Sequence, residues 1–222
     1  MEETVRLVNE WAKFKKDHAD GDLEEFCRHY LISKREEKDI GQNFGGLVPP
    51  QTNAYLIKLI ARILQYCAIY SKAAFEIIPE IRNFDDFNFL NSVRHLQEQN
   101  NKEPRKTDVI NYNLVELSSG IDIINRLLKL QLIEERPDPE DKRAKLMKIT
   151  DLGEKILFKC FEQLLVVNDM LWLGMSEEDK KLCIQLLKGV EIKHFNYVLE
   201  LKGKSLAEMV AVVLGVKDKK GI

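Results

Sequence analysis

Residues 133–150 read Ile-Glu-Glu-Arg-Pro-Asp-Pro-Glu-Asp-Lys-Arg-Ala-Lys-Leu-Met-Lys-Ile-Thr, and this stretch decides the fold. It is entered through Leu132, Ile133 and Glu134, an apolar-polar alternation that predicts a short strand. The two prolines that follow should interrupt regular structure, because proline has no N–H group and restricts the residue before it. The chain then returns through the mostly apolar residues 146–149, which are enough for a second strand. The stretch therefore predicts a β-hairpin with a long, charged tip.

Two short helices are expected just before the hairpin, over about residues 107–115 and 118–130. Thr107 and Ser118 are good N-cap residues, because a hydroxyl can accept a hydrogen bond from a free N–H group of the first helical turn. Helix, tight turn, helix and charged hairpin together predict a winged helix-turn-helix, in which the second helix enters the major groove of DNA. The second helix is expected to point four apolar side chains inward: Ile121, Ile124, Leu127 and Leu128.

Several marks in this region are similar to the MarR family of bacterial transcriptional regulators. They comprise Arg126-Leu127, the run from Leu132 to Arg143, the run from Leu146 to Thr150, and Gly153. The most specific of them is the Asp-Pro-x-Asp-x-Arg sequence that ends the first run. The resemblance implies a homodimeric regulator that binds double-stranded DNA, with a small-molecule effector as a further partner.

The hairpin tip supplies the first candidate DNA contacts. An arginine at such a tip can enter the narrow minor groove, where A·T-rich DNA concentrates negative potential, and we assign this role to Arg143. We expect Asp141 to hold the Arg143 side chain through a charge-assisted hydrogen bond, a pairing that the family resemblance also implies. Lys142, Lys145 and Arg105 are candidate phosphate contacts. The alternative interpretation is a solvated turn without a partner.

The polar face of the second helix supplies the other candidates. Serine and asparagine can bond base edges, and arginine can reach either a phosphate or a guanine. Asp122 on the same face weakens the case, because an unpaired carboxylate near phosphate is unfavourable. The preceding turn also lacks the glycine common in the family, whereas Gly120 lies within the helix. The alternative is a solvated polar face. The candidates are Ser118, Ser119, Asn125 and Arg126.

The composition does not by itself indicate a nucleic-acid-binding protein. The 222 residues carry a net charge of −2, and 45% of them are hydrophobic, as in an ordinary globular protein. Residues 101–150 contain ten Lys or Arg and nine Asp or Glu, so any positive patch must be local. The basic residues gather from Lys142 to Lys148 with no acidic residue between them. Such a cluster strengthens DNA binding through counterion release.

The remainder of the chain is predicted to be helical, which makes the fold mainly α with one small β-hairpin. Long apolar terminal helices cannot be fully covered within one such chain, so we expect a twofold dimer to bury them. Its symmetry would present two recognition helices to a palindromic operator. The expected domains are a helical extension at 1–50, a dimerisation helix at 51–84, a winged helix-turn-helix DNA-binding domain at 85–157 and C-terminal dimerisation helices at 158–222.

Other kinds of chemistry find little support. The histidines and cysteines lack metal-site spacing, and the sequence shows no phosphate-binding glycine loop or nucleophile motif, so we expect no enzyme, metal or cofactor. A redox role for Cys27 or Cys67, which lie near tyrosines, is an alternative to inert thiols. The acidic Met1-Glu-Glu start does not lead into a signal peptide, and Lys58 and Arg62 interrupt the longest apolar stretch. A cytoplasmic protein is therefore expected.

The leading hypothesis is a homodimeric DNA-binding transcriptional regulator that acts as a repressor, with release by a small ligand implied by the resemblance alone. The competing hypothesis is a winged-helix module for protein–protein interaction that does not bind DNA. Its support is the nearly neutral charge, Asp122 and the acidic N-terminal region. Salt dependence separates the two hypotheses, because affinity for duplex DNA falls steeply as salt is added.

Overall fold

The computed structural model of the chain describes residues 2–35, 52–141, 143–195 and 197–215. The chain divides into two compact units, Met1–Lys58 and Leu59–Ile222. No helix within the described ranges is both long enough and apolar enough to cross a membrane.

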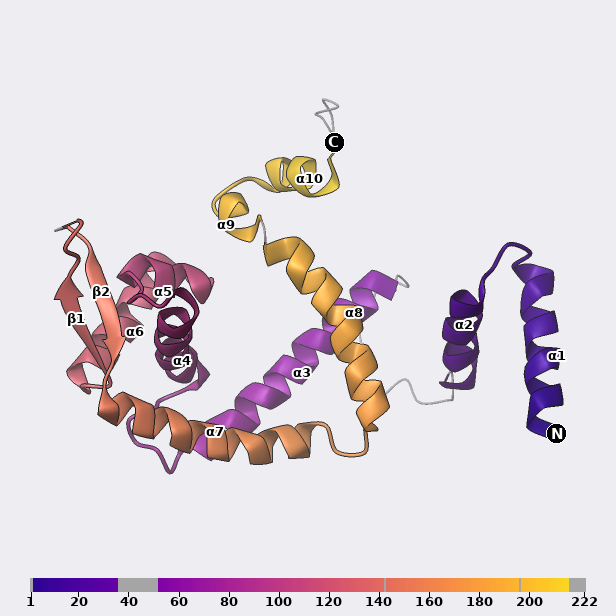
Figure 1. Cartoon of the computed structure of the whole chain (residues 1–222), viewed down its shortest axis with the longest axis horizontal. Coiled ribbons are helices and arrows are strands. Elements are labelled where there is room, and N and C mark those ends of the chain that lie inside the picture. Colours follow the sequence, from indigo (N-terminus) through magenta and orange to yellow (C-terminus); the bar gives the residue numbers. More distant parts are fainter. Residues whose placement is uncertain (1, 36–51, 142, 196, 216–222) are drawn as a thin grey trace. The chain divides into compact units, whose positions relative to one another are not determined.

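The first unit contains a helical hairpin of α1 (Glu2–Asp17) and α2 (Leu23–Arg35) (Figure 1). Its small core is aromatic: Phe14 and Phe26 are buried, and the Trp11 ring meets the edge of Phe26 with a centroid distance of 5.0 Å. Gly21 belongs in the connecting turn because a Cβ at this position would lie 2.7 Å from the Phe14 ring. The aromatic rings of α1 and α2 therefore pack together next to Gly21, where a side chain would not fit.

The second unit contains the winged helix and the helices that follow it (Figure 1). The helix α3 (Thr52–Phe75) begins in the first unit and ends in the second. The remaining elements are α4 (Phe84–Asn100), α5 (Lys106–Tyr112), α6 (Leu117–Lys129), β1 (Ile133–Pro137), β2 (Lys145–Ile149), α7 (Asp151–Leu171), α8 (Glu177–Phe195), α9 (Val198–Leu201) and α10 (Leu206–Leu214).

The predicted hairpin is confirmed. Strands β1 and β2 pair antiparallel, with Ile133 opposite Ile149 and Pro137 opposite Lys145. The expectation that the Pro137 region ends regular structure was wrong by one residue, because Pro137 itself closes β1 at the last position of the ladder. Proline is tolerated there because an edge position needs no further N–H donor. The result is a short two-stranded ribbon with a loop at residues 138–144.

The core of the winged helix lies between α4, α5, α6, the hairpin and the start of α7. Its fully buried side chains include Leu90, Val93, Ile124 and Leu127. The inward face of α6 differs from the predicted one, because Ile123 is buried while Ile121 and Leu128 are only partly buried. Helix α6 is therefore rotated slightly from the expected face. The polar residues on its other side stay exposed.

Both helices begin earlier than predicted, because each N-cap lies two residues before the expected one. Helix α5 is capped by Arg105 and α6 by Glu116, rather than by Thr107 and Ser118. At the start of α5 the free backbone N–H group of Arg105 is satisfied by a residue of the first turn, because it donates a hydrogen bond of 2.9 Å to the Asp108 carboxylate. Helix starts depend on the conformation of the preceding turn, which a single hydroxyl-bearing residue does not reveal.

The turn between α5 and α6 also explains the unusual glycine pattern. Leu114 occupies the left-handed conformation with φ of 54°, at a turn position where glycine would be expected. Gly120 is needed for packing instead, because a Cβ there would lie 2.7 Å from Cγ1 of Ile110 on α5. The glycine thus sets the approach of the two helices rather than the geometry of the turn.

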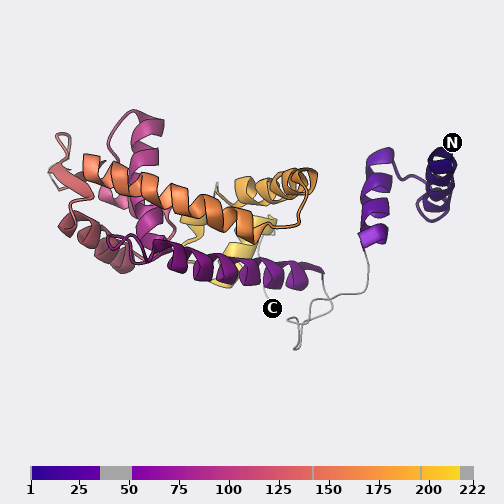
Figure 2. The ribbon, with the colours of Figure 1, turned by 90° about the horizontal axis from the view of Figure 1, so that it is seen from below.

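Beyond the wing, α7 leads away from the winged helix and turns into α8 (Figure 1 and Figure 2). Thr150 caps α7, since its hydroxyl accepts a hydrogen bond of 3.0 Å from the Gly153 N–H group. Helix α8 buries none of its described side chains, although it carries a series of large apolar residues. These exposed apolar residues include Leu182, Ile184, Leu186, Leu187, Val190, Ile192 and Phe195.

Candidate nucleic-acid interface

The tip of the wing presents one basic side chain without a charged partner. Arg143 is exposed, and among the residues that the structure describes its guanidinium forms no ion pair. We predicted that Asp141 would hold the Arg143 guanidinium, but its carboxylate instead accepts a hydrogen bond of 3.0 Å from the backbone N–H group of Arg143. The carboxylate therefore shapes the loop and leaves the arginine side chain available. Lys142 lies outside the described residues.

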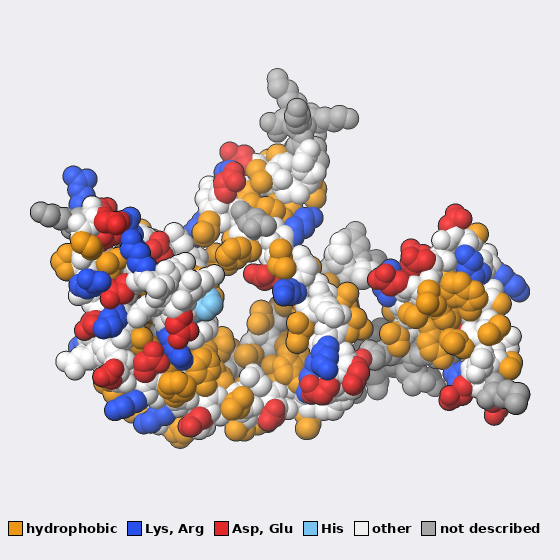
Figure 3. Space-filling view, viewed as in Figure 1, with side chains coloured by type: hydrophobic (Ala, Val, Ile, Leu, Met, Phe, Trp, Pro, Cys, Tyr) orange, Lys and Arg blue, Asp and Glu red, His pale blue; other side chains and the backbone are white. Residues whose placement is uncertain are grey.

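The other lysines of the wing are partly neutralised across the ribbon. Lys145 lies 3.9 Å from Glu135, and Lys148 lies 3.7 Å from Glu134. Exposed pairs of this kind are weak, so a phosphate can replace the carboxylate at little cost. On the face of the winged helix that Figure 3 shows, acidic and basic side chains are mixed and form no broad basic patch.

Arg105 anchors the loop of the wing to the start of the first helix of the helix-turn-helix. Its Nε and Nη2 atoms lie 2.9 Å and 2.8 Å from Oδ2 of Asp138, a carboxylate that is 1% exposed. The backbone N–H group of Glu140 donates to the other carboxylate oxygen at 2.9 Å. This backbone bond, together with Arg105, holds the pKa of Asp138 below its usual value. The predicted phosphate role of Arg105 is replaced by this structural one.

Sequence reasoning missed the role of Asp138, although it begins the Asp-Pro-x-Asp-x-Arg mark. Its partner is 33 residues away in the chain, so nothing in the local pattern reveals the pairing. The available signal was an acidic residue between two prolines, where a carboxylate can accept from the N–H group two residues later.

The start and outer side of α6 present a polar face. Ser118, Ser119, Asp122 and Asn125 are all exposed, in agreement with their predicted position on the free side of the recognition helix. Neutral hydroxyl and amide groups there can bond base edges in a major groove. Asp122 remains a negative group on this face. The surface is thus suited to selective contact rather than to strong nonspecific attraction.

Arg126 does not belong to that face. Its guanidinium is turned inward and donates from Nε to Oδ2 of Asp86 at 3.1 Å, with a second hydrogen bond to Oδ1. Asp86 is fully buried, and it also accepts a hydrogen bond from the Arg82 N–H group at 2.9 Å. The prediction that Arg126 contacts DNA is therefore corrected, because its charge is used to hold α6 against the start of α4.

The sequence comparison identifies the domain that these elements form. Residues 85–153 match the family described as Winged helix DNA-binding domain. The protein carries a winged helix DNA-binding domain. This domain contains α4, α5, α6 and the hairpin, and the match is to a DNA-binding family rather than to an enzyme family. No curated protein matches the sequence significantly.

Solved structures show which winged-helix fold the chain has. A MarR variant from E. coli in complex with operator DNA is 22% identical over 61% of this chain and 93% of its own, with a TM-score of 0.54. A MarR-family transcriptional regulator from Rhodococcus sp. RHA1 is 13% identical over 64% and 95%, with a TM-score of 0.55. Bordetella bronchiseptica BpsR, whose DNA binding is regulated by 6-hydroxynicotinic acid, is 17% identical over 62% and 98%, with a TM-score of 0.51. The resemblance of the wing sequence to the MarR family is thus confirmed at the level of the fold.

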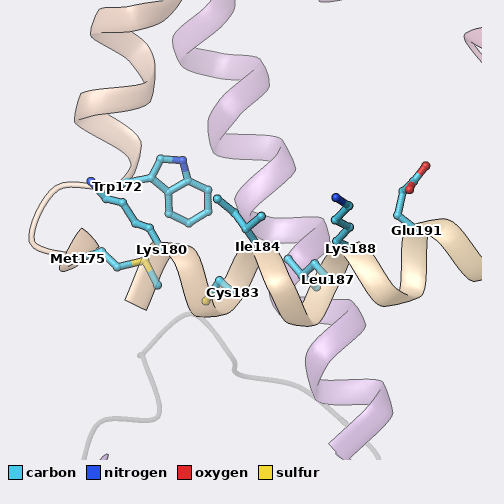
Figure 4. Close-up of a pocket in the computed structure, with 8 residues that line it drawn as sticks. All are labelled: Trp172, Met175, Lys180, Cys183, Ile184, Leu187, Lys188 and Glu191. Atoms are coloured by element: carbon cyan, nitrogen blue, oxygen red, sulfur yellow. The ribbon is translucent and has the colours of Figure 1, made fainter. Parts of the chain in front are cut away.

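An apolar groove lies outside the winged helix domain, where α7 turns into α8 (Figure 4). It has a volume of about 510 Å³ and is bounded by Trp172, at the end of α7, and by Ile184 and Leu187 on α8. Lys180, Lys188 and Glu191 supply its charged groups. The groove lies within the predicted C-terminal dimerisation helices.

The cysteines differ widely in exposure. Cys160 is fully buried in the core, and burial raises the pKa of its thiol to about 12, so it stays protonated and unreactive. Cys27 and Cys183 are exposed, and Cys67 is partly exposed. Among the described residues, no group of three or more His, Cys, Asp or Glu side chains is placed to hold a metal ion.

Proposed function

We propose that the protein is a DNA-binding transcriptional regulator that acts as a homodimer on a palindromic operator, with repression as its mode of action. The observation that carries this proposal is the winged helix DNA-binding domain at residues 85–153, whose wing ends in an exposed arginine without an ionic partner. The anchoring of the wing by Arg105 and Asp138 supports the same function, because a fixed wing loses less entropy when it enters a groove.

The proposed contacts divide between two grooves. Arg143 enters the minor groove, and Asp141 gives the loop the shape that presents it. Ser118, Ser119 and Asn125 read base edges in the major groove from the exposed face of α6. Two lysines of the wing, Lys142 and Lys145, contact phosphates, and Lys145 exchanges its Glu135 partner for DNA.

A second copy of the chain is the proposed partner of the C-terminal helices. The apolar side chains exposed on α7 and α8, among them Val166, Met170, Ile184 and Leu187, form too much nonpolar surface for a lone chain in water. A twofold contact would cover this surface, including the groove beside Trp172, and would set two recognition helices at a spacing that suits a palindrome. Release of the operator by a small effector molecule is part of the proposal, by analogy with the regulated relatives.

The direct test is a gel-shift titration of the purified full chain with duplex DNA taken from upstream of its own gene. The proposal requires a specific complex at nanomolar concentrations, with one dimer on each site and an affinity that falls steeply between about 50 and 200 mM salt. A shuffled duplex of the same composition serves as the control. Equal affinity for both duplexes would contradict the proposal.

The competing function, protein–protein interaction without DNA binding, rests on the exposed carboxylate of Asp122 in the middle of the recognition face. Near phosphate this group is repelled, whereas on a protein partner it could pair with a basic side chain. Absence of any DNA complex at low salt would favour this alternative. In that case the polar face of α6 would be the surface to use in a search for protein partners.

A further inference from the structure

A side chain from the C-terminal region is bonded to the turn of the helix-turn-helix. Lys202 follows α9, and its Nζ atom donates a hydrogen bond of 2.6 Å to the carbonyl oxygen of Val115. The same Nζ atom lies 3.9 Å from Oε1 of Glu116, the N-cap residue of α6. Lys202 and Val115 are 87 residues apart in the sequence. The start of the recognition helix is therefore tied to a segment beyond the long C-terminal helices.

The tied turn is strained and needs external support. Leu114 precedes Val115 and adopts a φ of 54°, a conformation that is costly for a residue other than glycine. Its side chain is 56% exposed, so burial of Leu114 contributes little to offset the strain. Strained conformations of this kind persist only where the surrounding structure holds them in place.

Hydrogen bonds from side chains hold the turn on both sides of Leu114. Before it, Nδ2 of Asn113 donates to the buried hydroxyl oxygen of Ser92 on α4 and to the carbonyl of Val109, each at 2.8 Å. After it, Lys202 donates to the carbonyl of Val115. The first support belongs to the winged helix itself, whereas the second comes from the C-terminal helices. Removing Lys202 would leave the side nearest to α6 without its brace.

The segment that carries Lys202 is seated against the helix-turn-helix. Leu201 is buried, and α8 and α9 face α5 across a groove of about 440 Å³. Tyr112 and Leu114 line one wall of this groove, and Phe195 and Leu199 line the other. Because the groove leaves space between the walls, the two parts meet over a limited area. Within that limited area, the hydrogen bond from Lys202 to Val115 is a polar contact that holds the two parts together.

We propose that Lys202 is a positioning residue for DNA recognition: it holds the strained turn at Leu114 and thereby sets the first turn of α6 in the orientation that binds the operator. The inference rests on the proposed DNA-binding function and extends it to the C-terminal helices. The apparent affinity of a site scales with the fraction of molecules in the competent conformation, so a movement of α8 and α9 that breaks the contact weakens DNA binding. Lys202 itself touches no DNA in this scheme.

The first experiment compares operator affinity among full-length variants. Lys202→Met keeps the length of the side chain but removes its donor, and we expect it to weaken binding about fivefold, as befits one lost hydrogen bond. Lys202→Arg keeps a donor and should bind within twofold of the parent. Lys204→Met is the matched control, because it removes the same charge from the same segment but loses only a surface pair with Glu200. Equal losses in Lys202→Met and Lys204→Met would overturn the proposal.

A double-mutant cycle with Leu114→Asn separates positioning from direct phosphate contact. Asparagine tolerates the left-handed conformation, so Leu114→Asn lowers the strain that Lys202 has to oppose. In this background, Lys202→Met should cost less than twofold in affinity. A loss that stays fivefold, together with a salt slope reduced by about one, would show that Lys202 binds a phosphate instead.

Hydrogen exchange of the Gly120 amide supplies a readout that does not depend on DNA. This N–H group donates to the carbonyl of Glu116 at 2.9 Å, in the first turn of α6. Lys202→Met should speed its exchange while amides in the middle of α4 stay as protected as in the parent. Unchanged exchange at Gly120 would refute the positioning role. If the parent chain bound no DNA, the proposed function would fail, but the exchange measurement would still decide this inference.

Discussion

The buried carboxylate of Asp86 accepts two hydrogen bonds from the guanidinium of Arg126 and so fixes α6 to the start of α4. The pair joins two positions 40 residues apart. The Arg126 side chain is 22% exposed and that of Asp86 is fully buried, so the carboxylate has no access to water if its partner is removed. This pair stabilises the fold and only indirectly affects contact with DNA.

Arg126→Ala should therefore act on stability. Removing one partner of a buried pair leaves an uncompensated charge, and the expected loss is about 3 kcal/mol in the free energy of unfolding, measured by urea denaturation. Arg136→Ala is the control, since the Arg136 side chain is 60% exposed where it pairs with Glu103, and its loss should cost clearly less stability than the loss of Arg126. If Arg126→Ala unfolds at the same urea concentration as the parent but binds the operator poorly, Arg126 contacts DNA and the structural role is wrong.

Arg143→Ala should act on DNA binding alone. The side chain has no ionic partner among the described residues, so its removal leaves the fold and the dimer intact. We expect operator affinity to fall by about 1–3 kcal/mol, most strongly on sites with an A·T-rich flank. Fluorescence anisotropy on matched A·T-rich and G·C-rich flanks measures both effects. Arg136→Ala again provides a control that removes one positive charge from the same hairpin.

Acid should loosen the anchor of the wing through Asp138. The backbone N–H group of Glu140 and the guanidinium of Arg105 lower the pKa of this carboxyl in the folded chain below its ordinary value of 3.8. At a pH between the folded and the unfolded pKa of Asp138, the unfolded chain binds more protons than the folded chain. The ionised Asp138 therefore stabilises the fold above about pH 4, and this stabilisation is lost as the pH falls through the folded pKa. Asp138→Asn should flatten the dependence of the unfolding free energy on pH below pH 4. Parallel curves for the variant and the parent would contradict the assignment.

Gln131→Gly should stabilise the winged helix. Gln131 joins α6 to β1 with a φ of 56°, and its side chain is exposed, so truncation removes little packing. Relief of about 1–2 kcal/mol of left-handed strain outweighs the greater chain entropy of glycine, about 0.5–1 kcal/mol. The net gain should appear as a rise in Tm. Gln131→Ala keeps the strain and should show no such rise.

The parts of the fold that sequence predicted are the parts that short-range patterns specify. The hairpin follows from apolar alternation around residues 133–149, and the polar face of α6 follows from helical spacing. The two corrected arginines show the limit of such patterns. Arg105 and Arg126 looked like phosphate contacts because they are basic and lie in the DNA-binding region, yet each is bound to a buried aspartate, Asp138 and Asp86 respectively.

Those pairings depend on how elements pack, and no local spacing specifies them. The same holds for the start of α6, which follows the left-handed Leu114, and for Lys202, whose partner is 87 residues away. Sequence could identify the surface that faces DNA. It could not separate the charges that remain available for a ligand from those that hold the domain together.

The bond between Arg105 and Asp138 ties the loop of the hairpin to the start of α5. We expect this tie to hold the Arg143 guanidinium at a set distance from the exposed face of α6 before the protein binds DNA. Arg143 and α6 can then both contact DNA only where the A·T-rich minor groove and the half-site lie at that same distance along the duplex. Inserting one base pair between the A·T-rich flank and the half-site should therefore harm binding more than many single-base substitutions within either element.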